Sequence, residues 1–151
     1  MVEVIVIGTE PPCIRCSRVV QLVNEASEEI GLSVRVKSLA FQSPEAQGLA
    51  ADWQRELGTA RDVARKGAAD VDWGLVTALM RKEWSPDLDR ELRPCQELAD
   101  KIQILMTPVL IVNGKLKHHG SVPGPDRILA WLKEEAAGKD RCWKKAKNDT
   151  G

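Results

Sequence analysis

Hydrophobic and polar positions in the first 40 residues predict a strand, a helix and a second strand. The run 2–7 is short, rich in β-branched residues and closed by Gly8, which is typical of a strand buried on both faces. Apolar residues recur at helical spacing over 16–30, and Gly31 suits the C-terminal stop of that helix. Residues 32–39 then alternate between apolar and polar, as in a half-buried strand. The pattern therefore predicts a βαβ unit, whose crossover is almost always right-handed.

The middle of the chain, about 42–87, has helical periodicity and predicts a helical insertion. Ser43 and Pro44 suit the N-cap and first position of a helix that Gly58 would close. A second apolar stripe runs over 71–84. Three tryptophans occur in these stripes, and we interpret them as packing residues because large aromatic side chains bury much area in small helical layers. They are Trp53, Trp73 and Trp84.

The end of the chain predicts a β-hairpin followed by a helix. The strand-like runs 109–112 and 115–119 are joined by Asn113 and Gly114. This is the strongest short-range hairpin signal, because both residues accept the positive φ of a type I′ turn. A helical pattern follows over 125–138.

These elements predict one α/β domain over residues 1–138. We expect a central four-stranded mixed sheet flanked by helices, with the helical insertion at about 42–87 lying between the second and third strands. Residues 88–103 suit a helix, which Pro94 is expected to split or restart. The polar, basic tail 139–151 is expected to be frayed.

Composition narrows the classes of function. A chain of 151 residues is long enough to bury a core without disulfide bonds or a structural metal, so cysteine pairs are interpreted as chemistry. Acidic and basic side chains balance at 22 each, which argues against a nucleic-acid partner. The N-terminal run lacks the features of a signal peptide, and no stretch has the length of a membrane span. We therefore expect a cytoplasmic protein, with no membrane partner, whose four cysteines are reduced.

The candidate chemistry lies in Cys13-Ile14-Arg15-Cys16, where the first loop becomes a helix. At a helix N-terminus the Cys13 sulfur faces unsatisfied N–H groups, which stabilise a thiolate and lower its pKa. Arg15 adds a nearby cation. Cys16 lies one turn later, within disulfide reach but more buried, which suits a thiol that resolves a mixed disulfide. We expect Cys13 to attack and Cys16 to resolve.

A second motif, Thr107-Pro108, is expected beside the first. If the later hairpin pairs antiparallel to the first strand, the start of 109–112 lies next to Cys13. A proline before a strand has no N–H to give the sheet, so its backbone neighbours remain free to pair with an extended peptide over the sulfur. We expect Pro12, Arg15, Thr107 and Pro108 to contact substrate.

With these motifs the sequence resembles the thioredoxin superfamily, in particular small thioredoxin-like or glutaredoxin-like redox proteins of prokaryotes. Besides the cysteine pair, the resemblance rests on the stretches 106–115 and 120–123. It implies a thiol–disulfide oxidoreductase that needs no cofactor. Its expected partners are a disulfide-containing protein or small-thiol substrate and an electron-donating reductase. It also implies that Pro108 is the cis-proline of the family, which contacts the active-site sulfurs and helps to exclude metal.

The chain departs from the family pattern in two places. Pro12 replaces the usual tryptophan before the first cysteine, and Ile14-Arg15 replaces Gly-Pro between the cysteines, so the redox potential cannot be inferred. The buried acid that thioredoxins carry late in the preceding strand is also missing. Glu10 is the nearest carboxylate. It could accept the proton of the second cysteine, or it could be an exposed charge of the loop.

Other cysteines and histidines leave alternatives open. A non-catalytic interaction module or a metal carrier of the same fold remains possible. His118 and His119 could join the cysteine pair in a zinc site, but adjacent strand residues point to opposite faces, so we expect an exposed strand end and no metal. Cys95 could be an extra resolving thiol or a passive helix residue. Cys142 lies in the tail and is interpreted as incidental.

Overall fold

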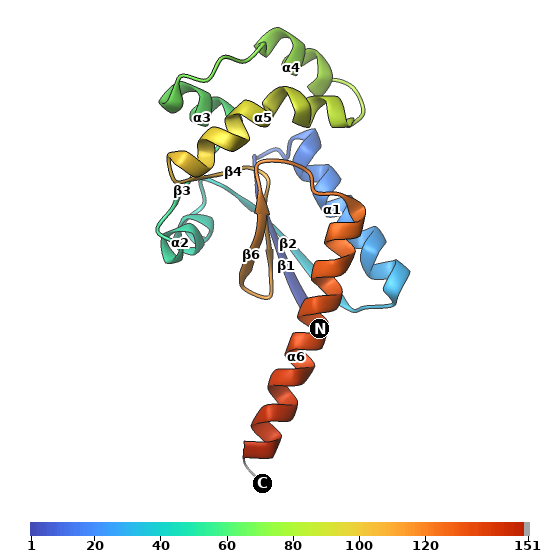
Figure 1. Ribbon diagram of the computed structural model, residues 1–151. Helices are drawn as coiled ribbons and strands as arrows, with labels where there is room; N and C mark the ends of the chain where they lie inside the picture. Colours follow the sequence, from blue (N-terminus) through green and yellow to red (C-terminus); the bar gives the residue numbers. More distant parts are fainter. Residues whose placement is uncertain (150–151) are drawn as a thin grey trace.

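The structure, a computed structural model, describes the backbone of residues 1–149 and the side chains of residues 1–138. Four strands form a central sheet in the order β2-β1-β5-β6 (Figure 1). β1 is parallel to β2 and antiparallel to β5, and β6 returns antiparallel to β5. The mixed α/β sheet predicted from the sequence is thus confirmed. The strands are β1 (Val2–Gly8), β2 (Val34–Ala40), β5 (Val109–Val112) and β6 (Lys115–His119).

Helices cover both faces of the sheet because β1 is apolar on both. Val2, Val4 and Val6 pack with α1 (Ile14–Ile30) and α6 (Pro125–Asp149) in one core cluster. The alternate residues of β1 join a second cluster with α2 (Pro44–Asp52). α1 ends at Gly31, whose left-handed φ of 63° confirms the predicted stop.

The hairpin between β5 and β6 has the predicted turn. Asn113 and Gly114 have φ values of 50° and 77°, so both lie in the left-handed region that a type I′ turn requires. The pairing is irregular between Leu110 and Ile111, where the register shifts. The hairpin places the start of β5 beside the end of β1, where Val109 pairs with Ile7.

Three helices form a layer at the end of the sheet where β1 stops and α1 begins (Figure 1). We call α3 (Ala60–Gly67), α4 (Trp73–Met80) and α5 (Pro86–Lys101) the helical cap. The cap has a buried cluster of its own, to which all three helices contribute. It therefore positions side chains directly above the loop that carries Cys13.

A second, two-stranded sheet links the cap to the central sheet. β3 (Glu56–Gly58) pairs in parallel with β4 (Ile104–Met106). The predicted helix that Gly58 would close is wrong at its C-terminal end, because Gly58 lies in a strand. α2 ends instead at Asp52, and Gln54 takes a positive φ of 56° that turns the chain into β3. A strand of three residues is too short for alternation to reveal it.

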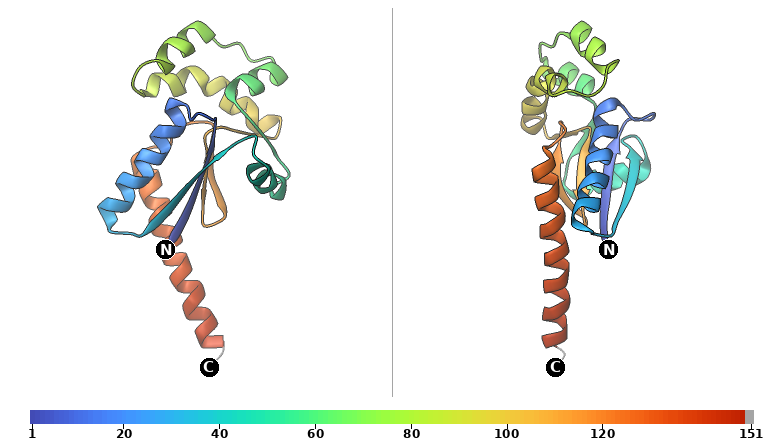
Figure 2. Two further views of the ribbon diagram at one scale, coloured as in Figure 1. Left: turned by 180° about the vertical axis from the view of Figure 1, so that it is seen from behind. Right: turned by 90° about the vertical axis from the view of Figure 1, so that its right-hand side faces the viewer.

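Two further helix boundaries differ from the prediction. α5 is continuous through Pro94, because four buried residues that pack in the cap cluster offset one missing hydrogen bond. α6 does not end at Gly138 but runs to Asp149, past the edge of the sheet (Figure 2), since one glycine costs a helix only about 1 kcal/mol. Among the helices in the described part of the chain, none has both the length and the apolar character needed to cross a membrane.

Candidate functional site

The two cysteines of the CxxC motif lie together as free thiols at the start of α1. Cys13 is the N-cap residue, and its Sγ is 3.2 Å from Cys16 Sγ. Cys13 is half-buried, whereas Cys16 is buried. The Cys13 N–H donates to Thr9 Oγ1 at 2.9 Å, which fixes the loop before the helix. The predicted difference in accessibility between the two sulfurs is present.

The pKa values of the two thiols are shifted in opposite directions. A hydrogen bond from the Cys16 thiol lowers the pKa of Cys13 from 9.0 to about 6, against the opposing effect of burial, and backbone N–H groups of α1 add to the lowering. The Arg15 charge contributes least to that lowering. The same hydrogen bond, followed by burial, raises the pKa of Cys16 far above the usual range. At neutral pH, Cys13 is thus a thiolate and Cys16 a thiol that donates to it.

Gly8 makes this arrangement of sulfurs possible. A Cβ atom on Gly8 would lie 2.5 Å from Cys16 Sγ and 2.9 Å from its Cβ. Only a residue without a side chain lets the end of β1 approach Cys16 so closely. The sequence showed Gly8 as the end of a strand, and no signal in it revealed this contact.

Arg15 connects α1 to three distant parts of the chain instead of acting chiefly on the thiolate. Its guanidinium is buried, and its Nε donates to Asp89 Oδ1 at 2.8 Å. The remaining nitrogens donate to the carbonyl oxygens of Thr107, at 3.4 Å, and Gly120. Asp89 also accepts the Val122 N–H at 2.9 Å. The sequence did not single out Asp89, because it is one of several acids in the first turns of α5.

The Thr107–Pro108 peptide bond is cis, as expected, and so is Glu10–Pro11, which was not predicted. The expectation that the Thr107 backbone is free to pair with a peptide is wrong for its N–H. Its N–H donates to the Gly58 carbonyl at 2.9 Å, and its carbonyl accepts from Arg15. The reason is the parallel pairing of β3 with β4, which carries Gly58 to this position. Contact between Pro108 and the sulfurs stays a prediction.

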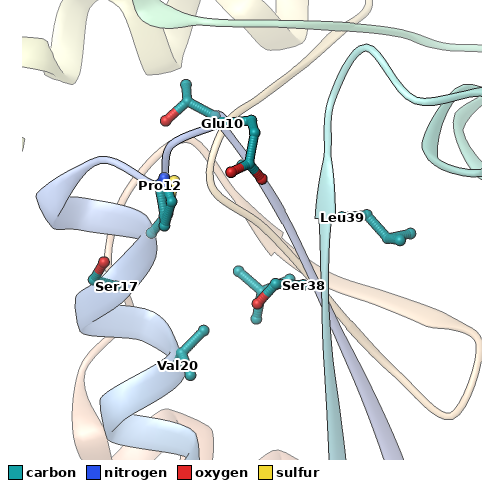
Figure 3. A pocket seen from close by; sticks show the side chains of 10 residues that line it. Glu10, Pro12, Ser17, Val20, Ser38 and Leu39 are labelled. Carbon is teal, nitrogen blue, oxygen red and sulfur yellow. The ribbon is translucent and has the colours of Figure 1, made fainter.

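One pocket lies beside Cys16, between α1 and the ends of β1 and β2 (Figure 3). It has a volume of about 230 Å³ and includes Pro12. Glu10 lies at its upper end, and the hydroxyl-bearing residues Ser17 and Ser38 flank it from α1 and β2. Glu10 thus lines the same pocket as the buried thiol, and its function as a proton acceptor stays a prediction.

A second pocket, which we call the cap pocket, lies beside Cys13 under the helical cap. It has a volume of about 200 Å³ and is bounded by the cysteine loop, Thr107 and the three cap helices. Arg15 also lines it, so contact of Arg15 with substrate stays a prediction. Its cap residues are Thr59, Ala60, Arg61, Trp73, Val76, Met80 and Leu92.

The side chains of His118 and His119 are half-buried and hydrogen-bonded to other residues of the protein, so the expectation of an exposed strand end is wrong. His119 Nδ1 accepts the Met106 N–H at 3.1 Å, and its Nε2 lies 2.8 Å from Asp100 Oδ1. His118 Nε2 lies 2.7 Å from the Ser121 hydroxyl, and burial, with smaller effects of nearby charges, lowers the pKa of His118 to about 4. The side chains described for residues 1–138 contain no cluster of three or more metal-ligating groups.

Cys95 lies in the buried cluster of the cap. Burial raises the pKa of its thiol, so it has the character of a packing residue. Cys142 lies outside the residues whose side chains the structure describes.

Comparisons with known proteins agree with this geometry in part. The model of a family described as "Thioredoxin domain" matches residues 78–133, a stretch that includes Thr107 and Pro108 but neither cysteine of the motif. A crystal structure of the oxidoreductase DsbA from Xylella fastidiosa aligns with 93% of this chain and 87% of its own at 18% identity. Its TM-score is 0.34. No curated protein matches the chain.

Proposed function

We propose that the chain belongs to the thioredoxin superfamily and is a thiol–disulfide oxidoreductase whose redox pair is Cys13 and Cys16. The observation that carries the proposal is the 3.2 Å approach of the two sulfurs with opposite pKa shifts. A thiolate is the nucleophile in disulfide exchange, and the lowered pKa of Cys13 supports that function.

The reaction proceeds in two exchanges. The Cys13 thiolate attacks one sulfur of a substrate disulfide, a Cys13–substrate disulfide forms, and the first substrate thiolate leaves. Cys16 then loses its proton and attacks Cys13 Sγ. The Cys13–Cys16 disulfide forms and the second substrate thiolate leaves, so the substrate has gained two electrons and the protein has lost them.

The partners follow from this electron balance. The substrate is a disulfide-containing protein or a small-thiol disulfide, and an electron-donating reductase restores the dithiol. No cofactor takes part in the exchanges themselves. We propose that the protein works in the cytoplasm, where such a donor keeps thiols reduced.

Thiol trapping with mass mapping tests the proposal. Cys13→Ser is expected to abolish disulfide reduction, and Cys16→Ser is expected to accumulate mixed disulfides through Cys13. Cys95→Ser, a change in the buried cap cluster, is the control and is expected to trap nothing. Equal trapping by both motif variants would contradict the assigned functions of the two thiols. Metal retained through chelator washing, without reversible two-electron oxidation, would favour a metal-carrying module instead.

A further inference from the structure

The cap pocket lies beside Cys13, the cysteine proposed to attack, and most of its lining is apolar. Ala60, Val76, Met80 and Leu92 come from all three cap helices and give it an apolar lining. Met80 is 41% exposed, so a flexible side chain lies at the surface end of the pocket. The inference drawn from this pocket rests on the proposed function.

The backbone N–H of Thr107 is not free to pair with a substrate strand. An extended peptide would have to compete with Gly58 for the Thr107 N–H, a bond of 2.9 Å within the protein. The Thr107 carbonyl already accepts from buried Arg15. With the N–H taken, the side chains of the cap pocket are left to contribute selectivity near Cys13.

The volume of the pocket limits what can enter. A cavity of about 150 Å³ holds a benzene molecule in a protein core. The cap pocket, at about 200 Å³, therefore suits one substituted ring or a branched alkyl group of similar size. It is too small for a folded segment of polypeptide.

One exposed cation at the pocket, Arg61, contacts an aromatic ring and has no carboxylate partner among the side chains described for residues 1–138. Arg61 lies over the Trp73 ring, 4.6 Å from its centroid, and both residues line the pocket. The neighbouring acid Asp62 pairs with Arg65 instead. Among the side chains described for residues 1–138, no carboxylate forms an ion pair with Arg61. A ligand anion can supply the missing partner.

We propose that the preferred substrates are small disulfides whose sulfur carries a compact apolar group with a carboxylate. The apolar group enters the cap pocket, the carboxylate pairs with Arg61, and the substrate sulfur lies beside Cys13 Sγ. The exchange forms the Cys13–substrate disulfide and releases one substrate thiolate. Cys16 then forms the Cys13–Cys16 disulfide and releases the second, so the reduced protein itself supplies the two electrons.

Single-turnover kinetics with the reduced full chain test this proposal. The probes are bis(4-carboxyphenyl) disulfide, its neutral bis(methylamide), and 3,3′-dithiodipropionate, which keeps the carboxylate and lacks the ring. Each rate constant is divided by that of a small monothiol with the same probe, which removes differences in intrinsic reactivity. We expect the carboxyphenyl probe to exceed dithiodipropionate by about tenfold or more from burial of the ring. We expect it to exceed the neutral amide by about twofold to fivefold from the ion pair.

Matched variants assign these preferences to the pocket. Arg61→Gln is expected to remove the preference for carboxylate over amide, and Arg61→Lys to restore part of it. Ala60→Leu fills the pocket and is expected to reduce the preference for the ring. Arg81→Gln, at the end of α4 and outside the pocket, is the control and retains both preferences. Thermal unfolding of each variant shows whether the fold is kept.

The outcomes separate this inference from the proposed function. If every probe reacts with the same normalised rate while the Cys13–Cys16 disulfide forms, the cap pocket does not select substrates and only the inference fails. A disulfide-bonded peptide of about ten residues that reacts faster than the carboxyphenyl probe would also overturn it. If no probe produces the intramolecular disulfide, the proposed function fails.

Discussion

The hydrogen bond from Cys16 to Cys13 is the largest cause of the low pKa of Cys13, so its removal gives a quantitative test. Cys16→Ala deletes the donor, whereas Cys16→Ser replaces the thiol by a hydroxyl that can still donate. A hydrogen bond to a charged group contributes about 1.5–3 kcal/mol, and 1.36 kcal/mol corresponds to a tenfold change in acidity, so the midpoint for Cys13 rises from about pH 6 to about pH 7–8 in Cys16→Ala.

The assay is the pH dependence of Cys13 alkylation by iodoacetamide, followed by peptide mass mapping so that only Cys13 is counted. The midpoint is the correct readout, because a thiolate of lower pKa is also a weaker nucleophile and the plateau rate changes with it. Cys16→Ser is expected to keep a midpoint close to that of the wild type. An unchanged midpoint in Cys16→Ala, or equal shifts in both variants, would refute the assignment of the hydrogen bond as the main cause.

Two further changes test the packing around the dithiol. Asp89→Asn leaves the buried Arg15 cation without its carboxylate and is expected to lower the free energy of unfolding by about 3 kcal/mol, measured by urea titration of the reduced protein. The control is Asp87→Asn at an exposed ion pair, which should change the free energy of unfolding by less than about 1 kcal/mol. Equal losses in the two variants would show that Arg15 does not depend on its pair with Asp89. Gly8→Ala places a Cβ against Cys16 Sγ and is expected to lengthen the lifetime of the Cys13–substrate disulfide, measured by acid quench. The control is Gly124→Ala, whose added Cβ would have no atom within 4 Å and should leave this lifetime unchanged. A normal lifetime in Gly8→Ala would mean that Cys16 tolerates displacement.

Much of the fold was predictable because its signals are local. The buried run of β1, the helical stripe of α1 and the Asn113-Gly114 turn each report on neighbouring residues, and the structure has all three. The pairing of β3 with β4 was missed because a three-residue strand has no readable period and its partner lies 48 residues away.

In the candidate site, too, the features encoded by short motifs were predictable and the long-range contacts were not. The two cysteines and the cis bond before Pro108 were predicted from short motifs. The partners of Arg15 were not, because nothing in the sequence distinguishes Asp89 from the other acids of its helix. The hydrogen bond from the Thr107 N–H to Gly58 depends on the missed strand, so the expectation that this N–H is free was wrong for the same physical reason.

The hydrogen bonds of Arg15 have a consequence for the order in which the chain assembles during synthesis. Its three acceptors lie 74, 92 and 105 residues further along the chain. β1, α1 and β2 leave the ribosome first, yet the cation between the two cysteines cannot meet all of its acceptors until Gly120 has been made. The buried setting of Arg15, between the two cysteines, is therefore completed only after most of the polypeptide has been translated.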